Sequence, residues 1–68
     1  MFEYWPCAIK INDDGTEEQI STYESALTEE EAKAQFHIWK DRYKYNLKKC
    51  WIDLHENDLR VASKQVDI

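Results

Sequence analysis

The sequence has one glycine, one proline and no long run of apolar residues. Flexible linkers and low-complexity segments need far more glycine or proline, so both classes are excluded. A membrane-spanning helix needs about 20 consecutive apolar residues, so we expect no membrane segment. The N-terminus also lacks the basic start and apolar run of a signal peptide, which predicts a cytoplasmic protein.

Cysteine is scarce too, with only Cys7 and Cys50. Each lies in an alternating apolar run, where a free cysteine behaves as a small buried hydrophobe. A disulfide between the two is the alternative. The ligand spacings of zinc sites, with two cysteines or two histidines a few residues apart, do not occur. We therefore expect no metal and no cofactor.

Motifs of catalysis are absent as well, since the chain has no nucleophile elbow, phosphate loop or dinucleotide fingerprint. Asp53 and His55 share one side of an expected strand and could act as an acid–base pair, but no nucleophile is placed near them. A chain of 68 residues buries roughly 60% of its unfolded surface, too little for a deep cleft. We predict one small domain over residues 1–68 that is not an enzyme.

The strongest local signal that is present is a helix over residues 29–45. Thr28 and Glu31 form a capping box, in which the Glu31 amide donates to the Thr28 hydroxyl and the Thr28 amide donates to the Glu31 carboxylate. Asn46 is expected to stop the helix in a left-handed conformation. The apolar side that should face the core consists of Ala32, Phe36, Trp39, Tyr43 and Leu47.

Segments that alternate like strands flank this helix. Residues 3–11 alternate and lead through a turn with Gly15 into a weaker edge strand at 17–24. Residues 49–55 alternate, and a turn at 56–58 leads into a last strand whose apolar parity slips, which implies a bulge. The predicted fold class is α+β, with the order ββαββ and a four-stranded antiparallel sheet with one helix packed on one face. The sheet residues expected to meet the helix are Cys7, Ile9, Ile52, Leu54 and Val61.

A second apolar stripe on the helix is the first candidate binding surface. Ala34, Ile38 and Tyr45 fall on the side opposite the core stripe, and Asp41 borders them. One helix on one sheet cannot bury both stripes. The functional hypothesis is contact with a partner or a second copy, which would make a homodimer; the alternative is ordinary surface apolarity or cover by a terminus.

The second candidate is Trp51 on the sheet face away from the helix, together with Asp53, His55 and Tyr4. An indole on an open sheet can anchor a protein interface or stack on a base. In the alternative, Trp51 packs against neighbouring strand side chains and the stems of basic residues such as Lys10.

Bases alternate with aromatics over residues 40–49, which is the third candidate. Bases would hold a phosphate backbone while Trp51 stacks on a base. The bases expected to do so are Arg42, Lys44, Lys48 and Lys49. The net charge of −5 disfavours nucleic acid, and basic side chains also suit a helix C-terminus.

An acidic set is the fourth candidate, because residues 1–31 hold nine acids and a single base, Lys10. It could present negative charge to a basic partner. In the alternative, these acids form a solvated turn, an edge strand and a capped helix start. The acids named as partner-binding are Asp13, Asp14, Glu17 and Glu18.

Together these patterns predict a small, acidic, non-enzymatic protein that acts through a protein–protein interface. A concrete version is a bacterial or phage-encoded inhibitor of a nucleic-acid-binding host protein. The alternative is a small nucleic-acid-binding module that uses Trp51 and the basic segment 40–49. A homodimer through the second helix stripe is a third hypothesis.

Overall fold

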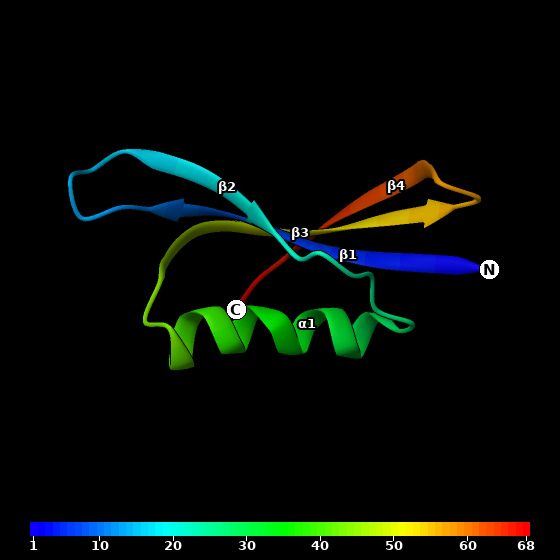
Figure 1. Ribbon diagram of the computed structural model, residues 1–68, viewed down its shortest axis with the longest axis horizontal. Helices are drawn as coiled ribbons and strands as arrows, with labels where there is room; N and C mark the ends of the chain where they lie inside the picture. Colours follow the sequence, from blue (N-terminus) through cyan, green and yellow to red (C-terminus); the bar gives the residue numbers. More distant parts are fainter.

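The computed structural model describes all of residues 1–68. Its strands are β1 (Phe2–Ile11), β2 (Glu17–Ser21), β3 (Asn46–Glu56) and β4 (Leu59–Val66). Between β2 and β3 lies one helix, α1 (Glu29–His37), which continues into a π-helical turn, η1 (Ile38–Arg42). All strand pairs are antiparallel, in the order β2-β1-β3-β4 (Figure 1). The predicted α+β class, with one helix and a four-stranded antiparallel sheet, is confirmed.

Both hairpin turns use the residues that the sequence predicts. Gly15 has a φ of 88° in the turn between β1 and β2, a conformation that glycine adopts without steric cost. Asn57 and Asp58 have φ values of 53° and 66° between β3 and β4. Asn and Asp tolerate the left-handed region better than other residues with a Cβ, so they suit this tight turn.

The helix begins as predicted at Thr28. The Glu31 amide donates to the Thr28 hydroxyl at 3.2 Å, which confirms half of the capping box. The Glu31 carboxylate accepts from the Leu27 amide at 3.2 Å, one residue before the expected donor. Three glutamates in the first turn add a favourable interaction with the helix dipole.

The end of the helix differs from the prediction, since it comes at Arg42 rather than at residue 45. The Tyr43 amide donates to the Ile38 carbonyl at 3.1 Å, and the Tyr45 amide donates to the Trp39 carbonyl at 2.9 Å. These wide turns end at Lys44, whose φ is 59°, so Lys44 and not Asn46 is the left-handed residue. Neither this helix nor any other part of the chain forms a helix long and apolar enough to span a membrane.

The wide last turn exchanges the roles of two tyrosines. Tyr43, predicted to face the core, is 54% exposed. Tyr45, predicted to lie on the outer stripe, packs against the core, and Lys10 Nζ lies 4.1 Å from the centre of its ring. The periodicity of a regular helix fails here because a π-helical turn rotates the following side chains relative to the α-helical pattern.

The buried core lies between the helix and the sheet. It consists of Ala8, Ala32, Phe36, Trp39, Cys50 and Ile52. The Phe36 side chain is fully buried, and its ring centre lies 5.9 Å from that of Trp39 in a tilted arrangement that favours aromatic pairs. Tyr4, Ile20, Leu47 and Val66 extend this core at its margins.

The face of β1 that meets the helix is the opposite of the one that the sequence predicts. Ala8 is completely buried in the core beside its register partner Cys50, so Cys7 and Ile9 point to the opposite face. Tyr4, expected on that opposite face, packs against the core. Size offers a physical reason, because small side chains such as Ala8 and Cys50 leave room for Phe36 and Trp39 in the shared core.

Strand β4 contains the bulge that the parity slip predicts. Leu54 pairs with Ala62 and His55 with Arg60, so Val61 is the extra residue. Val61 is 54% exposed and is absent from the core, contrary to the expected contact with the helix. Lys64 of β4 reaches the start of α1, where its Nζ lies 2.9 Å from Glu29 Oε1. This contact, followed by that of Lys33, lowers the pKa of Glu29.

We predict that Phe36→Ala lowers the free energy of unfolding by about 3–5 kcal/mol, because it leaves a cavity between helix and sheet. Tyr43→Ala should cost less than about 1.5 kcal/mol, since Tyr43 mainly stacks on Tyr45. Denaturant titration followed by tryptophan fluorescence measures both. Equal losses for the two variants would contradict this packing.

Candidate functional site

The face of the sheet turned away from α1 is the main candidate site, and we name it the open face. Figure 1 shows the helix on one side of the sheet and no helix on the other. Alternate side chains of a strand point to opposite faces, so the residues next to Ala8, Cys50 and Ile52 define it. In the two central strands these residues are Glu3, Trp5, Cys7, Ile9 and Ile11 of β1 and Lys49, Trp51, Asp53 and His55 of β3.

The open face has an apolar row along a central strand. Four of the five open-face residues of β1 are apolar, and Trp51 extends this row because it is the register partner of Cys7. Cys7 is buried, whereas both tryptophans and both isoleucines of the row are partly exposed. A row of this kind on the uncovered side of a sheet is unusual, because one face of an antiparallel sheet normally meets water through polar residues.

A hollow of about 340 Å³ lies at one end of this row. Trp5, Cys7, Asp53 and His55 line it, together with Gln19 and Ser21 of β2. The Trp5 and His55 rings lie 6.0 Å apart. Trp5 Nε1 and Asp53 Oδ1 are buried and have no hydrogen-bond partner, which is costly for both groups. The hollow is therefore lined by both polar and apolar side chains, and two of them each have one buried polar atom without a partner.

The other end of the row carries two lysines. The register of β1 and β3 shifts after Ile9, which makes Lys48 the extra residue of a bulge. Lys48 Nζ lies 2.8 Å from Glu17 Oε2, and Lys49 Nζ lies 5.6 Å from the centre of the Trp51 ring. The indole thus has a lysine beside it, but this is Lys49 and not the expected Lys10, which lies over Tyr45; Trp51 is still partly exposed.

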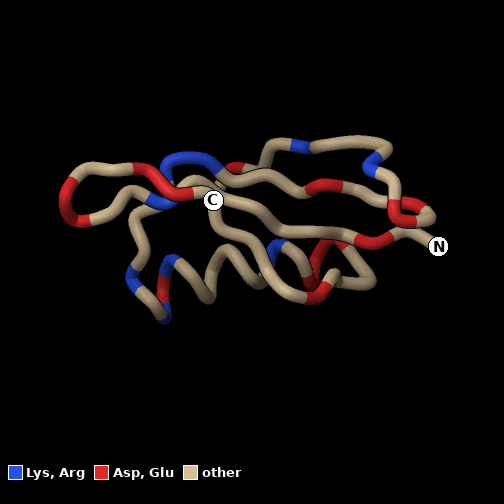
Figure 2. The backbone as a smooth tube through the Cα atoms, turned by 45° about the horizontal axis from the view of Figure 1, so that its top comes forward, with Lys and Arg blue, Asp and Glu red and all other residues tan.

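Charges on the open face balance. Glu17 offsets Lys48, Asp53 offsets Lys49, and Glu3 and Arg60 lie on either side of His55 in the register. The whole chain has a net charge of −5, so its excess acids lie elsewhere. Figure 2 shows acidic residues in the turn between β1 and β2 and at the start of the helix.

The hollow contains residue types found in hydrolases, but its thiol is not activated. Cys7 Sγ lies 3.7 Å from Asp53 Oδ2 and 3.7 Å from Ser21 Oγ. Burial raises the pKa of the Cys7 thiol, and the nearby Asp53 carboxylate raises it further. His55 packs against Trp5, so it does not serve as the base of a thiolate pair. No three His, Cys, Asp or Glu side chains are grouped to hold a metal ion.

The two cysteines are both free and lie on opposite faces of the sheet. Cys50 belongs to the core, and burial raises its pKa as well. A Cys7–Cys50 disulfide, the alternative considered from the sequence, is therefore excluded in this fold.

The predicted surface on the helix is smaller than expected. Ala34 is exposed, Ile38 is 37% exposed, and the Asp41 side chain is 70% exposed beside His37. Tyr45 does not join them, because it packs under Lys10 against the core. Only Ala34 and Ile38 remain as apolar members, and their role in binding stays a prediction.

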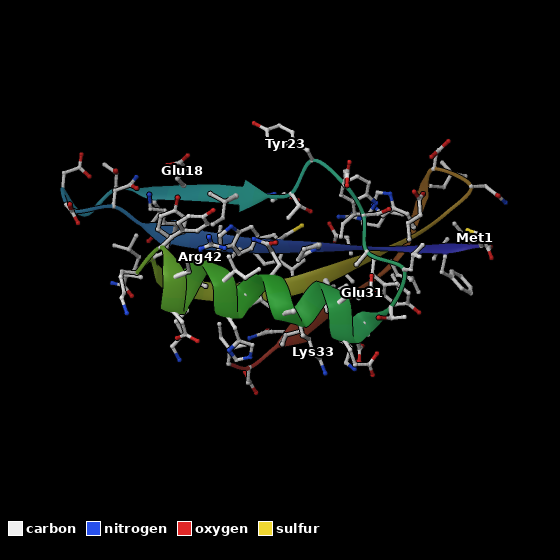
Figure 3. The ribbon with its side chains drawn as sticks, turned by 60° about the horizontal axis from the view of Figure 1, so that its bottom comes forward. Met1, Glu18, Tyr23, Glu31, Lys33 and Arg42 are labelled. Carbon is white, nitrogen blue, oxygen red and sulfur yellow. The ribbon has the colours of Figure 1, made fainter.

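The predicted acidic residues lie at one end of the molecule. Asp13 and Asp14 are in the turn after β1, and Glu17 and Glu18 are on β2. A second acidic group lies at the other end, where Glu24 and Glu31 border a groove beside Tyr23. Figure 3 shows Tyr23 projecting from the body of the molecule, in keeping with its full exposure. The acids form two separate groups, so they do not make one continuous surface.

Sequence reasoning found Trp51, but it assigned Ile9 to the core and named neither Trp5 nor Ile11 as a binding residue. Both faces of β1 are largely apolar, so periodicity alone does not tell which one meets the helix. A usable signal was the size of Ala8, since a helix with two large aromatics needs a small residue beneath them.

Comparison with known proteins identifies no family for this chain. No protein-family model matches it, and neither a curated protein nor a solved structure is significantly similar to it. Function must therefore be inferred from the chain's own residues, because fold class alone does not indicate activity.

We predict that both thiols react slowly with a disulfide reagent in the native state and rapidly after unfolding. Because their folded pKa values lie above the ordinary value of 9.0, the native state keeps protons that the unfolded state releases. Their contribution to stability is complete below pH 9.0 and is lost as the pH rises further. Denaturant titrations from neutral to alkaline pH measure this loss. A variant with Cys7→Ala and Cys50→Ala should lose less stability over the same range; an equal loss would contradict the assignment.

Proposed function

We propose that this chain is a small, non-enzymatic binding protein whose working surface is the open face of the sheet. The observation that supports this most is the apolar row of Trp5, Ile9, Ile11 and Trp51 on the side that the helix leaves uncovered. Contiguous apolar surface rimmed by polar groups is typical of protein interfaces.

The chemistry of the row favours a protein partner. Tryptophan is enriched among the residues that dominate binding energy, and such residues cluster near the centre of an interface. Trp51 lies near the middle of the open face, between Lys49 and Asp53 along β3. Gln19 and Ser21 of β2, at the edge of the row beside Ile9 and Cys7, resemble the polar rim of an interface.

The state of the cysteines supports two further parts of the proposal. A buried thiol with a raised pKa is a poor nucleophile, which agrees with a protein that binds rather than catalyses. Two free cysteines that cannot pair are in keeping with a reducing compartment such as the cytoplasm. An inhibitor of a larger protein is one form that such a binding protein could take.

We predict that Trp51→Ala weakens binding to the partner by on the order of 30-fold, the loss of about 2 kcal/mol typical of a central tryptophan. Ile9→Ser should weaken it as well. The measurement is capture from nuclease-treated lysate of the source cells on immobilised protein, followed by titration of the captured protein.

The matched control is Ile38→Asp, which changes an exposed apolar residue on the helix instead of the sheet. It should leave capture unchanged. If Ile38→Asp abolishes capture and Trp51→Ala does not, the working surface is the helix and the proposal is wrong.

Nucleic acid is a second candidate partner, favoured by one observation. Lys49 lies against Trp51 on the open face, and the neighbouring bulge adds Lys48. Single-stranded nucleic acids bind to such combinations of bases and aromatic rings. The balanced charge of the face and the pI of about 4.9 make this alternative weaker than a protein partner.

Salt separates the two candidates. Binding through 6–10 phosphate contacts should weaken by about 10³–10⁵-fold between 50 and 200 mM salt. We predict no binding of single-stranded oligonucleotides at physiological salt, measured by fluorescence anisotropy. Tight oligonucleotide binding with this salt dependence, lost in Trp51→Ala, would favour the nucleic-acid alternative.

A further inference from the structure

The order of charges along β3 on the open face has a symmetry of its own. Lys49, Trp51 and Asp53 follow one another at every second position, about 6.6–6.8 Å apart. Lys49 and Asp53 therefore lie at the same distance from Trp51 in opposite directions. A rotation that reverses the strand about Trp51 puts the aspartate in the place of the lysine and the lysine in the place of the aspartate. On β1 the nearest pair keeps this symmetry, since Ile9 and Trp5 lie at equal distances on either side of Cys7 and both are apolar; the next pair, Ile11 and Glu3, does not.

We propose that the partner on the open face is a second copy of this chain, related by a two-fold axis that crosses β3 at Trp51. This inference rests on the proposed function, because it takes the open face to be a protein interface. The axis lies in the interface and runs across the strands. It brings Lys49 of each copy opposite Asp53 of the other and brings Ile9 opposite Trp5.

Charge complementarity selects this arrangement over the other two-fold one. An axis parallel to the strands would set Lys49 against Lys49 and Asp53 against Asp53, which is repulsive. In the proposed arrangement the face contacts itself without excess charge, although each chain has a net charge of −5. Such a self-complementary patch is what an isologous dimer requires.

The size of the face also suits a dimer. The molecule measures 39 × 21 × 20 Å, and its longest axis runs along the sheet (Figure 1). A face of these dimensions offers on the order of 800 Å², the area that each partner contributes to a standard interface. Two sheets packed face to face lie about 10 Å apart, a gap that the Trp51 and Lys49 side chains can fill.

The test exchanges the charges of Lys49 and Asp53 and measures the molar mass of the protein in solution. Sedimentation equilibrium of the wild type should give twice the monomer mass of 8.2 kDa at high protein concentration. Lys49→Asp alone and Asp53→Lys alone should each weaken self-association by at least about tenfold, since like charges then meet across the axis. The double variant with both changes should recover the dimer, because each new aspartate then faces a new lysine.

Ile38→Asp is the control and should leave the dimer intact. If Asp53→Lys does not fold, isotope-filtered NMR takes the place of the charge-exchange variants. The sample is wild-type protein in which half of the chains carry the isotope label. The expected signals are contacts between the two copies of Trp51 and between Lys49 and Asp53, and their absence in a dimer would overturn the proposal.

Other outcomes contradict the proposal that the partner is a second copy, but they leave the open face as a binding surface. A wild type that stays monomeric at millimolar concentration excludes the dimer, while capture of another protein that depends on Trp51 would still support the open face as an interface. A dimer that is lost only in Ile38→Asp would place the contact between copies on the helix and overturn the axis at Trp51 in the same way.

Discussion

The contact between Ala8 and the aromatic residues of the helix determines how the rest of the molecule is arranged. Phe36 and Trp39 share one buried cluster with the sheet, and two large aromatics pack densely there because a strand offers a small side chain. Ala8 provides it at the centre of the sheet. That choice turns the neighbouring residues of β1 to the other face, so the packing of the core also sets the composition of the open face.

Local signals in the sequence were sufficient for the elements and their order. The Thr28 cap, Gly15 and the Asn57–Asp58 turn each depend on the preferences of a few adjacent residues, and the structure agrees with them. The parity slip of the last strand likewise indicated the bulge at Val61. The end of the helix was not predictable in this way, because Lys44 has no intrinsic preference for a positive φ and adopts it where the wide last turn returns the chain to the sheet.

The part of the candidate site on β3 could be predicted from the sequence, but the part on β1 could not, because it too depends on tertiary packing. Trp51 follows the core residue Cys50 and precedes Ile52, so its position on the outer face could be read from β3 alone. Trp5 and Ile9 belong to a strand with two apolar faces, where only tertiary packing decides the orientation. A misassigned strand of this type is informative, since apolar residues that the core does not use require another explanation.

The strand order has a consequence for the synthesis of the chain. Strand β1 is made first, but it lies between β2 and β3, and its pairing with β3 extends from Ile11 with Asn46 to Phe2 with Glu56. On the ribosome, the N-terminal hairpin must therefore wait for most of the chain before it gains its second neighbour, and an isolated hairpin is only marginally stable. Folding should begin after β3 has emerged from the exit tunnel, so the nascent chain would expose both apolar faces of β1 to chaperones until then.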